Sequence, residues 1–77
     1  MNHDFGWAIW RLKEGSRVTR VGWNGKNMWL ALHMPSAGEL MTLPYIYMST
    51  VTQDTVPWLA SQTDMLAEDW RCVDETT

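Results

Sequence analysis

Few residues in this 77-residue chain have the types and spacing needed for acid–base or nucleophilic chemistry. Asp64, Glu68 and Asp69 are close carboxylates, and Asp64 and Glu68 share one face if their segment is helical. A catalytic carboxylate pair needs two environments that push its two pKa values apart, and the sequence places no nucleophile or burying pocket beside this pair. We therefore do not predict catalysis by these carboxylates.

The sequence indicates no nucleophile, phosphate loop or metal centre. Ser61 lacks the G-x-S-x-G context of a hydrolase, and neither a P-loop nor a dinucleotide fingerprint occurs. His3, His33 and Cys72 lie far apart without metal-ligand spacing, so we expect neither a metal site nor a cofactor. Because Cys72 is the sole cysteine, a disulfide within the chain is excluded and the reducing cytoplasm is the expected compartment. These patterns favour a binding protein over an enzyme.

The aromatic and polar residues indicate what such a protein binds. Aromatic rings beside Asn, Gln, Ser, Thr and Lys suit a nucleotide, because the ring stacks on a base while the polar groups meet base edges, sugar and phosphate. The formal charge of −3 argues against polymeric nucleic acid, which needs clustered cations. A small nucleotide needs only a few donors. Four cations crowd into one short region, namely Lys13, Arg17, Arg20 and Lys26, although a solvated face is the usual explanation of such charges.

An N-terminal helix is the first element that positions these residues. Asp4 can cap a helix that runs to Glu14, where Gly15 supplies the stop. Its apolar stripe follows the i, i+3, i+4, i+7 rule and consists of Phe5, Ala8, Ile9 and Leu12. The opening residues, MNHDFGWAIW, contain no basic region and no long apolar run, so we expect neither a signal peptide nor a membrane span.

Trp7 and Trp10 lie off this stripe and, three residues apart, are neighbours on another face of the helix. Two exposed tryptophans side by side favour a contact between subunits, so we predict an oligomer interface there. The alternative is that both rings fold sideways over the edge of the core. A domain of this size buries a smaller fraction of its unfolded surface than a larger domain does. We therefore expect oligomerisation to supply part of its stability.

Three segments have the residue composition typical of β-strands, namely residues 17–23, 28–33 and 45–51. Asn24 and Gly25 between the first two predict a two-residue hairpin turn, because both residue types tolerate positive φ. A loop at 35–44 leads to the third segment, which is followed by a short return strand. Pro57 has no N–H for a sheet ladder, so this return strand is expected at a sheet edge.

The C-terminal part begins with a helix start. Ser61 and Asp64 have the spacing of a capping box, in which the hydroxyl accepts a backbone N–H and the carboxylate reaches back. We expect the helix over 62–68 and a last strand over 70–74. One long and one short helix with about four antiparallel strands predict an α+β fold, a small antiparallel sheet with the N-terminal helix packed on it, in a single domain over residues 1–77.

Two stretches read together, GWNGKNM at 22–28 and VPWLASQTDMLAEDW at 56–70, resemble small phage and prophage proteins of the second Thoeris anti-defence family. LKEG at 12–15 precedes them, and the resemblance covers nearly the whole chain. It implies a homotetramer that sequesters a cyclic ADP-ribose isomer, made by bacterial TIR-domain sensors, without cleaving it in the cytoplasm of the infected cell. Some relatives also hold cyclic dinucleotides at separate sites.

The resemblance also implies which residues meet the ligand. Trp23 and Met28 would pack against a base or ribose, with Asn24 and Lys26 near polar groups. The second stretch would supply hydrogen bonds from Ser61, Gln62, Thr63 and Asp64. By composition alone, a hairpin turn and a helix cap explain the same residues. An enzyme that degrades a cyclic nucleotide signal, and a ligand-free phage interaction or assembly module, are the alternatives from other classes.

Three features depart from the family pattern. Asn27 stands where glycine is common, the loop at 35–44 is short, and YIYMST replaces a strand that usually contains histidine. Since this loop and strand could line the ligand site, the exact ligand stays open.

Overall fold

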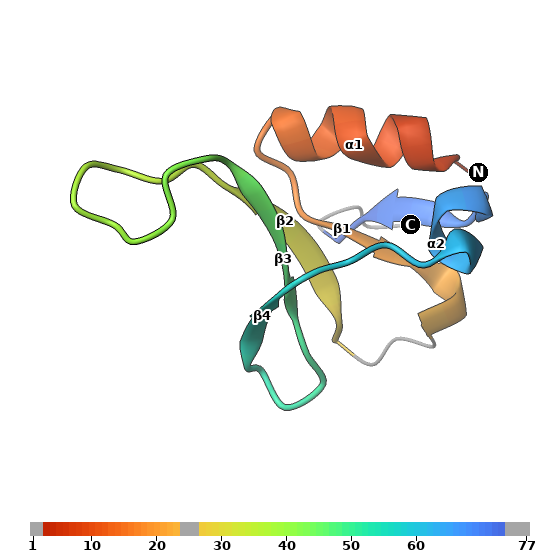
Figure 1. Cartoon of the computed structure of the whole chain (residues 1–77). Helices are drawn as coiled ribbons and strands as arrows, with labels where there is room; N and C mark the ends of the chain where they lie inside the picture. The colour runs from red at the N-terminus through yellow and green to blue at the C-terminus, as the bar shows by residue number, and fades with distance from the viewer. Residues whose placement is uncertain (1–2, 24–26, 74–77) are drawn as a thin grey trace.

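The computed structural model describes residues 3–23 and 27–73, which form one antiparallel sheet with a helix across one face (Figure 1). The elements in chain order are α1 (Phe5–Lys13), β1 (Val18–Arg20), the 3₁₀ turn η1 (Val21–Trp23), β2 (Trp29–His33), β3 (Tyr45–Ser49), β4 (Thr55–Pro57), α2 (Gln62–Leu66) and β5 (Trp70–Cys72). The strand order is β4-β3-β2-β1-β5, with every neighbouring pair antiparallel. The predicted α+β fold is therefore confirmed, with five strands.

Helix α1 begins and ends where its local chemistry predicts. The carboxylate of Asp4 accepts the backbone N–H of Trp7 at 2.9 Å. After the last turn, Gly15 adopts a left-handed φ of 91°, and the N–H groups of Gly15 and Ser16 donate to helix carbonyls at 3.0 Å. This is a Schellman ending, which glycine adopts without a Cβ penalty. Both the predicted cap and the predicted stop are confirmed.

The core lies between α1 and the sheet. Its fully buried side chains are Ala8, Leu12, Val18, Leu30 and Trp70. Phe5 and Ile9 pack against them as half-buried residues, so the predicted apolar stripe is confirmed. The opposite face of the sheet is not covered by a helix in the described part of the chain (Figure 1). None of the described helices is long and apolar enough to cross a membrane.

The predicted strand 17–23 is wrong in its second half. It ends at Arg20 because Asp69 takes the next backbone donors. The N–H of Val21 donates to the Asp69 carbonyl at 3.1 Å, and the N–H of Gly22 donates to the Asp69 carboxylate at 2.7 Å. The chain therefore turns into η1 after Arg20, and the predicted turn residues Asn24 and Gly25 lie outside the described residues.

The later elements follow the prediction with shorter bounds. Strand β4 pairs only with β3 among the described strands, with Pro57 opposite Tyr47, so the edge position is confirmed. Helix α2 stops at Leu66 instead of residue 68, because Ala67 has an extended backbone. Glu68 is therefore not on a helix and does not share a helical face with Asp64, which corrects that expectation.

Between β2 and β3, residues 34–44 form a loop that projects from the body, and the molecule measures 40 × 26 × 26 Å (Figure 1). Glu39 fixes the base of this loop. Its carboxylate accepts the N–H and the hydroxyl of Ser36 at 2.8 Å each and lies 2.7 Å from Nε2 of His33. The bonds from Ser36, together with His33, lower the pKa of Glu39 to about 2. The projection is a loop held in one conformation by its own polar contacts.

Candidate functional site

The two stretches singled out in the sequence meet around Trp70, whose side chain is fully buried. Rings of Trp23, Phe5 and Trp58 surround it, with centroid distances of 5.5, 5.6 and 6.2 Å to the Trp70 ring. Trp23 comes from η1, and Trp58 comes from the segment between β4 and α2. The three surrounding rings are half-buried, so part of each remains exposed and can stack on a flat ligand. We call these four rings the aromatic cluster.

Arg20 on β1 forms ion pairs with two carboxylates of the second stretch, residues 56–70. Its Nε donates to Asp69 at 2.8 Å and its Nη1 donates to Asp64 at 2.8 Å. The Arg20 side chain is only 15 % exposed, so these bonds are partly shielded from water. The hydrogen bond from Arg20, assisted by the N–H of Gly22, holds the pKa of Asp69 below its usual value, and the bond to Asp69 raises the pKa of Arg20. The charges stay paired at neutral pH.

The start of α2 is built around Asp64. The N–H of Asp64 donates to the Ser61 hydroxyl at 3.1 Å, and the N–H of Ser61 donates to the Asp64 carboxylate at 3.5 Å, so the predicted capping box is confirmed. The indole N–H of Trp70 donates to the Asp64 carbonyl at 3.1 Å. This one residue therefore connects the helix start to the aromatic cluster and to Arg20, while Gln62 and Thr63 stay exposed.

The structure brings some of the predicted ligand residues together. Trp23 and the first turn of α2 lie on the same side of the fold, since Trp70 contacts both the Trp23 ring and the Asp64 carbonyl. Met28 lines a separate pocket, described next. The predicted positions 24 and 26 lie outside the described residues.

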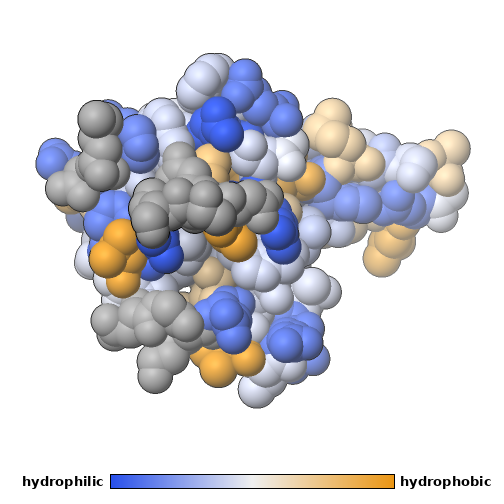
Figure 2. All heavy atoms as spheres, turned by 180° about the vertical axis from the view of Figure 1, so that it is seen from behind, coloured by the Kyte–Doolittle hydropathy of each residue, from blue (hydrophilic) through white to orange (hydrophobic). Residues whose placement is uncertain are grey.

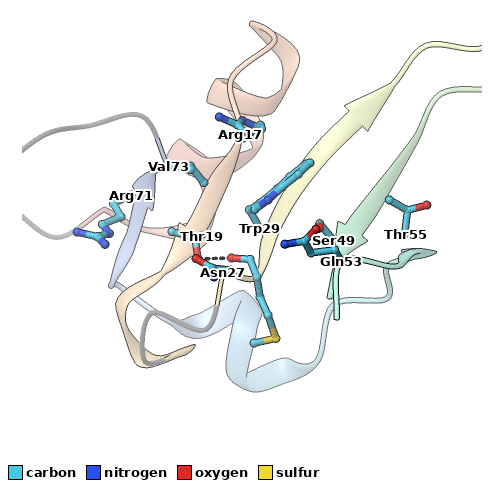
Figure 3. A pocket seen from close by; sticks show the side chains of 10 residues that line it. Arg17, Thr19, Asn27, Trp29, Ser49, Gln53, Thr55, Arg71 and Val73 are labelled. Carbon is cyan, nitrogen blue, oxygen red and sulfur yellow. Dashed lines mark hydrogen bonds between the residues drawn. The ribbon is translucent and has the colours of Figure 1, made fainter. Parts of the chain in front are cut away.

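A pocket of about 790 Å³ with both polar and apolar lining residues lies on the sheet face opposite α1 (Figure 3). Two arginines line it, Arg17 before β1 and Arg71 on β5, together with the ring of Trp29. The Arg17 guanidinium lies 5.0 Å from the Trp29 ring centroid, and the Thr19 hydroxyl donates to the Met28 carbonyl at 2.7 Å. Cationic donors beside an aromatic ring are suited to a phosphate attached to a flat group.

Comparison with known proteins connects this geometry to a family. A profile of the Tad2-like family, the Thoeris anti-defense 2-like domain, matches residues 3–73. The chain belongs to this family. It is also 42 % identical over 82 residues to the protein named Thoeris anti-defense 2 of Bacillus phage SP01, and the alignment covers 90 % of this chain and 92 % of that protein. The resemblance stated from the sequence is confirmed, and the chain is a phage anti-defence protein.

Several residues that organise this Tad2-like domain were not predicted from the sequence. Arg20 was noted only as one of four crowded cations, and its partners Asp64 and Asp69 lie 44 and 49 residues away in the chain. Trp58 lies inside the recognised stretch but was given no role. Arg71 carries no local sign of a pocket, and only its pairing opposite Thr19 on β1 places it there. The period-two alternation of β1 was the one available indication.

The predicted interface tryptophans of the Tad2-like domain differ in exposure. Trp7 is half-buried, packs against the core and stacks on His3 with 3.8 Å between ring centroids, so this ring does fold over the core edge. Trp10 is 53 % exposed. The guanidinium of Arg11 lies within 6 Å of both ring centroids, at 5.9 and 5.6 Å. Within residues 3–23 and 27–73, no group of three or more metal-ligating side chains could hold a metal ion.

Proposed function

We propose that this Tad2-like protein counters Thoeris defence as a sponge, which binds a cyclic ADP-ribose-type signalling nucleotide and retains it without cleaving it. The observation that carries this proposal is the contact between residues 22–28 and 56–70, in which the Trp23 ring packs on Trp70 and the N–H of Gly22 donates to Asp69. Family membership supports the anti-defence role. Packed rings and paired charges at the site support tight retention, because groups that are already in contact lose less conformational freedom on binding.

The chemistry of the proposed site follows from its exposed groups. The half-exposed rings of Trp23 and Trp58 offer stacking surfaces for adenine, and the exposed first turn of α2 presents the amide of Gln62 and the hydroxyls of Ser61 and Thr63. Asp64 is already bonded to Arg20, so its part is to position this turn and to accept from a ribose hydroxyl. By resemblance, Asn24 and Lys26 also belong to the proposed site, whereas Met28 would meet a ligand in the separate pocket that it lines with Arg17 and Arg71.

The proposal includes the assembly and the setting. The protein acts as a homo-oligomer, a tetramer by resemblance, in the cytoplasm of the infected bacterial cell. No cofactor, metal ion, membrane or nucleic-acid polymer takes part. A second class of ligand, cyclic dinucleotides, belongs to the proposal at a separate site, for which the pocket of Arg17 and Arg71 has suitable donors.

The decisive experiment separates capture from cleavage. The purified protein is incubated with a panel of cyclic ADP-ribose isomers, washed free of unbound nucleotide and heat-denatured, and the released material is identified by mass spectrometry. Release of the intact nucleotide, in proportion to protein, is the expected result. Release of an altered nucleotide identifies an enzyme instead, and retention of none of the isomers favours the ligand-free interaction module.

A further inference from the structure

The projecting loop at residues 34–44, here called the arm, exposes large apolar side chains. Leu40 is 95 % and Leu43 is 76 % exposed, and Met34 and Met41 are also exposed. Figure 2 shows hydrophobic atoms along the arm, on the far side of the view in Figure 1. Several exposed apolar side chains on one projecting loop favour a surface that another molecule covers.

The arm presents these side chains from a defined conformation. Glu39 accepts two hydrogen bonds from Ser36 and lies against His33 at the arm's base. Gly38 adopts a φ of 93°, which permits the tight turn beside them. Since these contacts tie His33, Ser36 and Glu39 together, the first half of the arm loses less conformational entropy on docking than a loop without them. The arm is therefore suited to insertion into a matching surface.

A matching surface exists on the same chain. An apolar groove of about 310 Å³ lies between the C-terminal half of α1 and the base of the arm. Its lining residues are Ile9, Leu12, Lys13, Leu32, Met34, Pro44 and Ile46. Lys13 is the one charged residue among them, and Glu39 on the arm carries the opposite charge. Met34 and Pro44, at the two ends of the arm, form part of the groove's wall. The arm projects from the body beyond them (Figure 1).

We propose that the arm of one copy docks in the groove of a second copy, and that the arm of the second copy docks in the groove of the first. Leu40 and Leu43 fill the apolar groove, and Glu39 approaches the Lys13 ammonium at its rim. Because both copies use the same arm and the same groove, the contact has two-fold symmetry and is complete with two copies, as in most protein dimers. This contact is distinct from the interface predicted at Trp10, and it does not require that the protein binds a nucleotide.

The first test asks whether arm and groove of different copies meet. Leu40→Cys and Lys13→Cys chains with different tags are co-expressed, and the full-length proteins are treated with a short bis-maleimide cross-linker. A mixed-tag cross-link is expected. The matched control pairs Lys13→Cys with Val51→Cys, an exposed residue on the β3–β4 turn outside the arm. Equal cross-linking in both mixtures, or none with Leu40→Cys, overturns the proposal.

The second test measures self-association in the absence of any nucleotide. In sedimentation equilibrium, Leu40→Ser with Leu43→Ser is expected to weaken dimerisation roughly 100-fold or more, since two leucines per copy lose their burial. Val51→Ser is expected to behave like the parent. An unchanged association constant for the double variant overturns the proposal. A double variant that dissociates yet still captures nucleotide separates the arm contact from the sponge function.

Discussion

At the scale of single residues, Trp23 is the side chain on which the proposed capture depends most. Trp23→Ala removes a partly exposed stacking surface, so we expect nucleotide affinity to fall by about 1–3 kcal/mol, or roughly 5- to 150-fold. Trp23→Phe keeps an aromatic face and is expected to retain most of the affinity. Isothermal titration calorimetry with the captured isomer measures both. An alanine variant that remains folded and binds like the parent contradicts the role of Trp23.

Asp69 contributes at the same scale through its bonds to Arg20 and Gly22. Because the folded pKa is depressed, its stabilisation is present above the ordinary Asp value of 3.8 and is lost as pH falls through the lower folded value. We expect Asp69→Asn to lower the free energy of unfolding by about 2 kcal/mol at pH 7.

Urea unfolding of parent and Asp69→Asn at pH 7 and pH 3 measures this effect. The difference between the two proteins should shrink at pH 3, where the unfolded carboxyl is protonated. Glu68→Gln, one residue away and exposed, is the matched control and is expected to change stability by less than about 0.5 kcal/mol. An equal difference at both pH values would show that Asp69 stabilises by shape and not by charge.

At the scale of elements, the short helix α2 depends on its cap. Ser61→Ala is expected to cost about 1 kcal/mol, because it leaves the Asp64 N–H without its hydroxyl partner. Ser61→Asn keeps a capping oxygen and should cost less. Hydrogen exchange at the Met65 amide, which donates to the Ser61 carbonyl at 3.0 Å, reports the helix directly. Unchanged protection of this amide in the alanine variant contradicts the prediction.

Alanine substitutions at two glycines near the ends of α1 should change the stability of the protein in opposite directions. A Cβ on Gly15 meets no atom within 4 Å, but its φ of 91° is strained for alanine, so Gly15→Ala is expected to destabilise by about 1 kcal/mol. Gly6 lies inside the helix and a Cβ there makes only ordinary contact, so Gly6→Ala is expected to stabilise by up to about 1 kcal/mol. Thermal unfolding of both variants tests the pair; shifts of the same sign refute it.

At the scale of the whole molecule, Trp10 tests the predicted oligomer interface. Its ring is 53 % exposed, so Trp10→Ala removes little from the fold of one copy. If a partner covers the ring, the variant should associate about tenfold or more weakly in sedimentation equilibrium. The thermal midpoint of the parent should also rise with protein concentration. A variant with the parent's mass at every concentration places the interface elsewhere on the molecule.

The sequence by itself determined the features that depend on near neighbours in the chain. The Asp4 cap, the Gly15 stop, the apolar stripe of α1 and the Ser61–Asp64 box all involve residues at most one or two turns apart, and each is confirmed. The edge position of Pro57 follows from its missing N–H. Long matching stretches also indicated the family, which the profile match confirms.

Only the tertiary structure decided where these features meet. The bonds from Arg20 to Asp64 and Asp69 span 44 and 49 residues, and the ring contacts around Trp70 join η1 to the segment after β4. Such contacts depend on strand order and register, which place β1 beside β5. Local spacing carries no information about that pairing. For the same reason the end of β1 at Arg20, which Asp69 imposes from across the fold, could not be predicted from residues 17–23 alone.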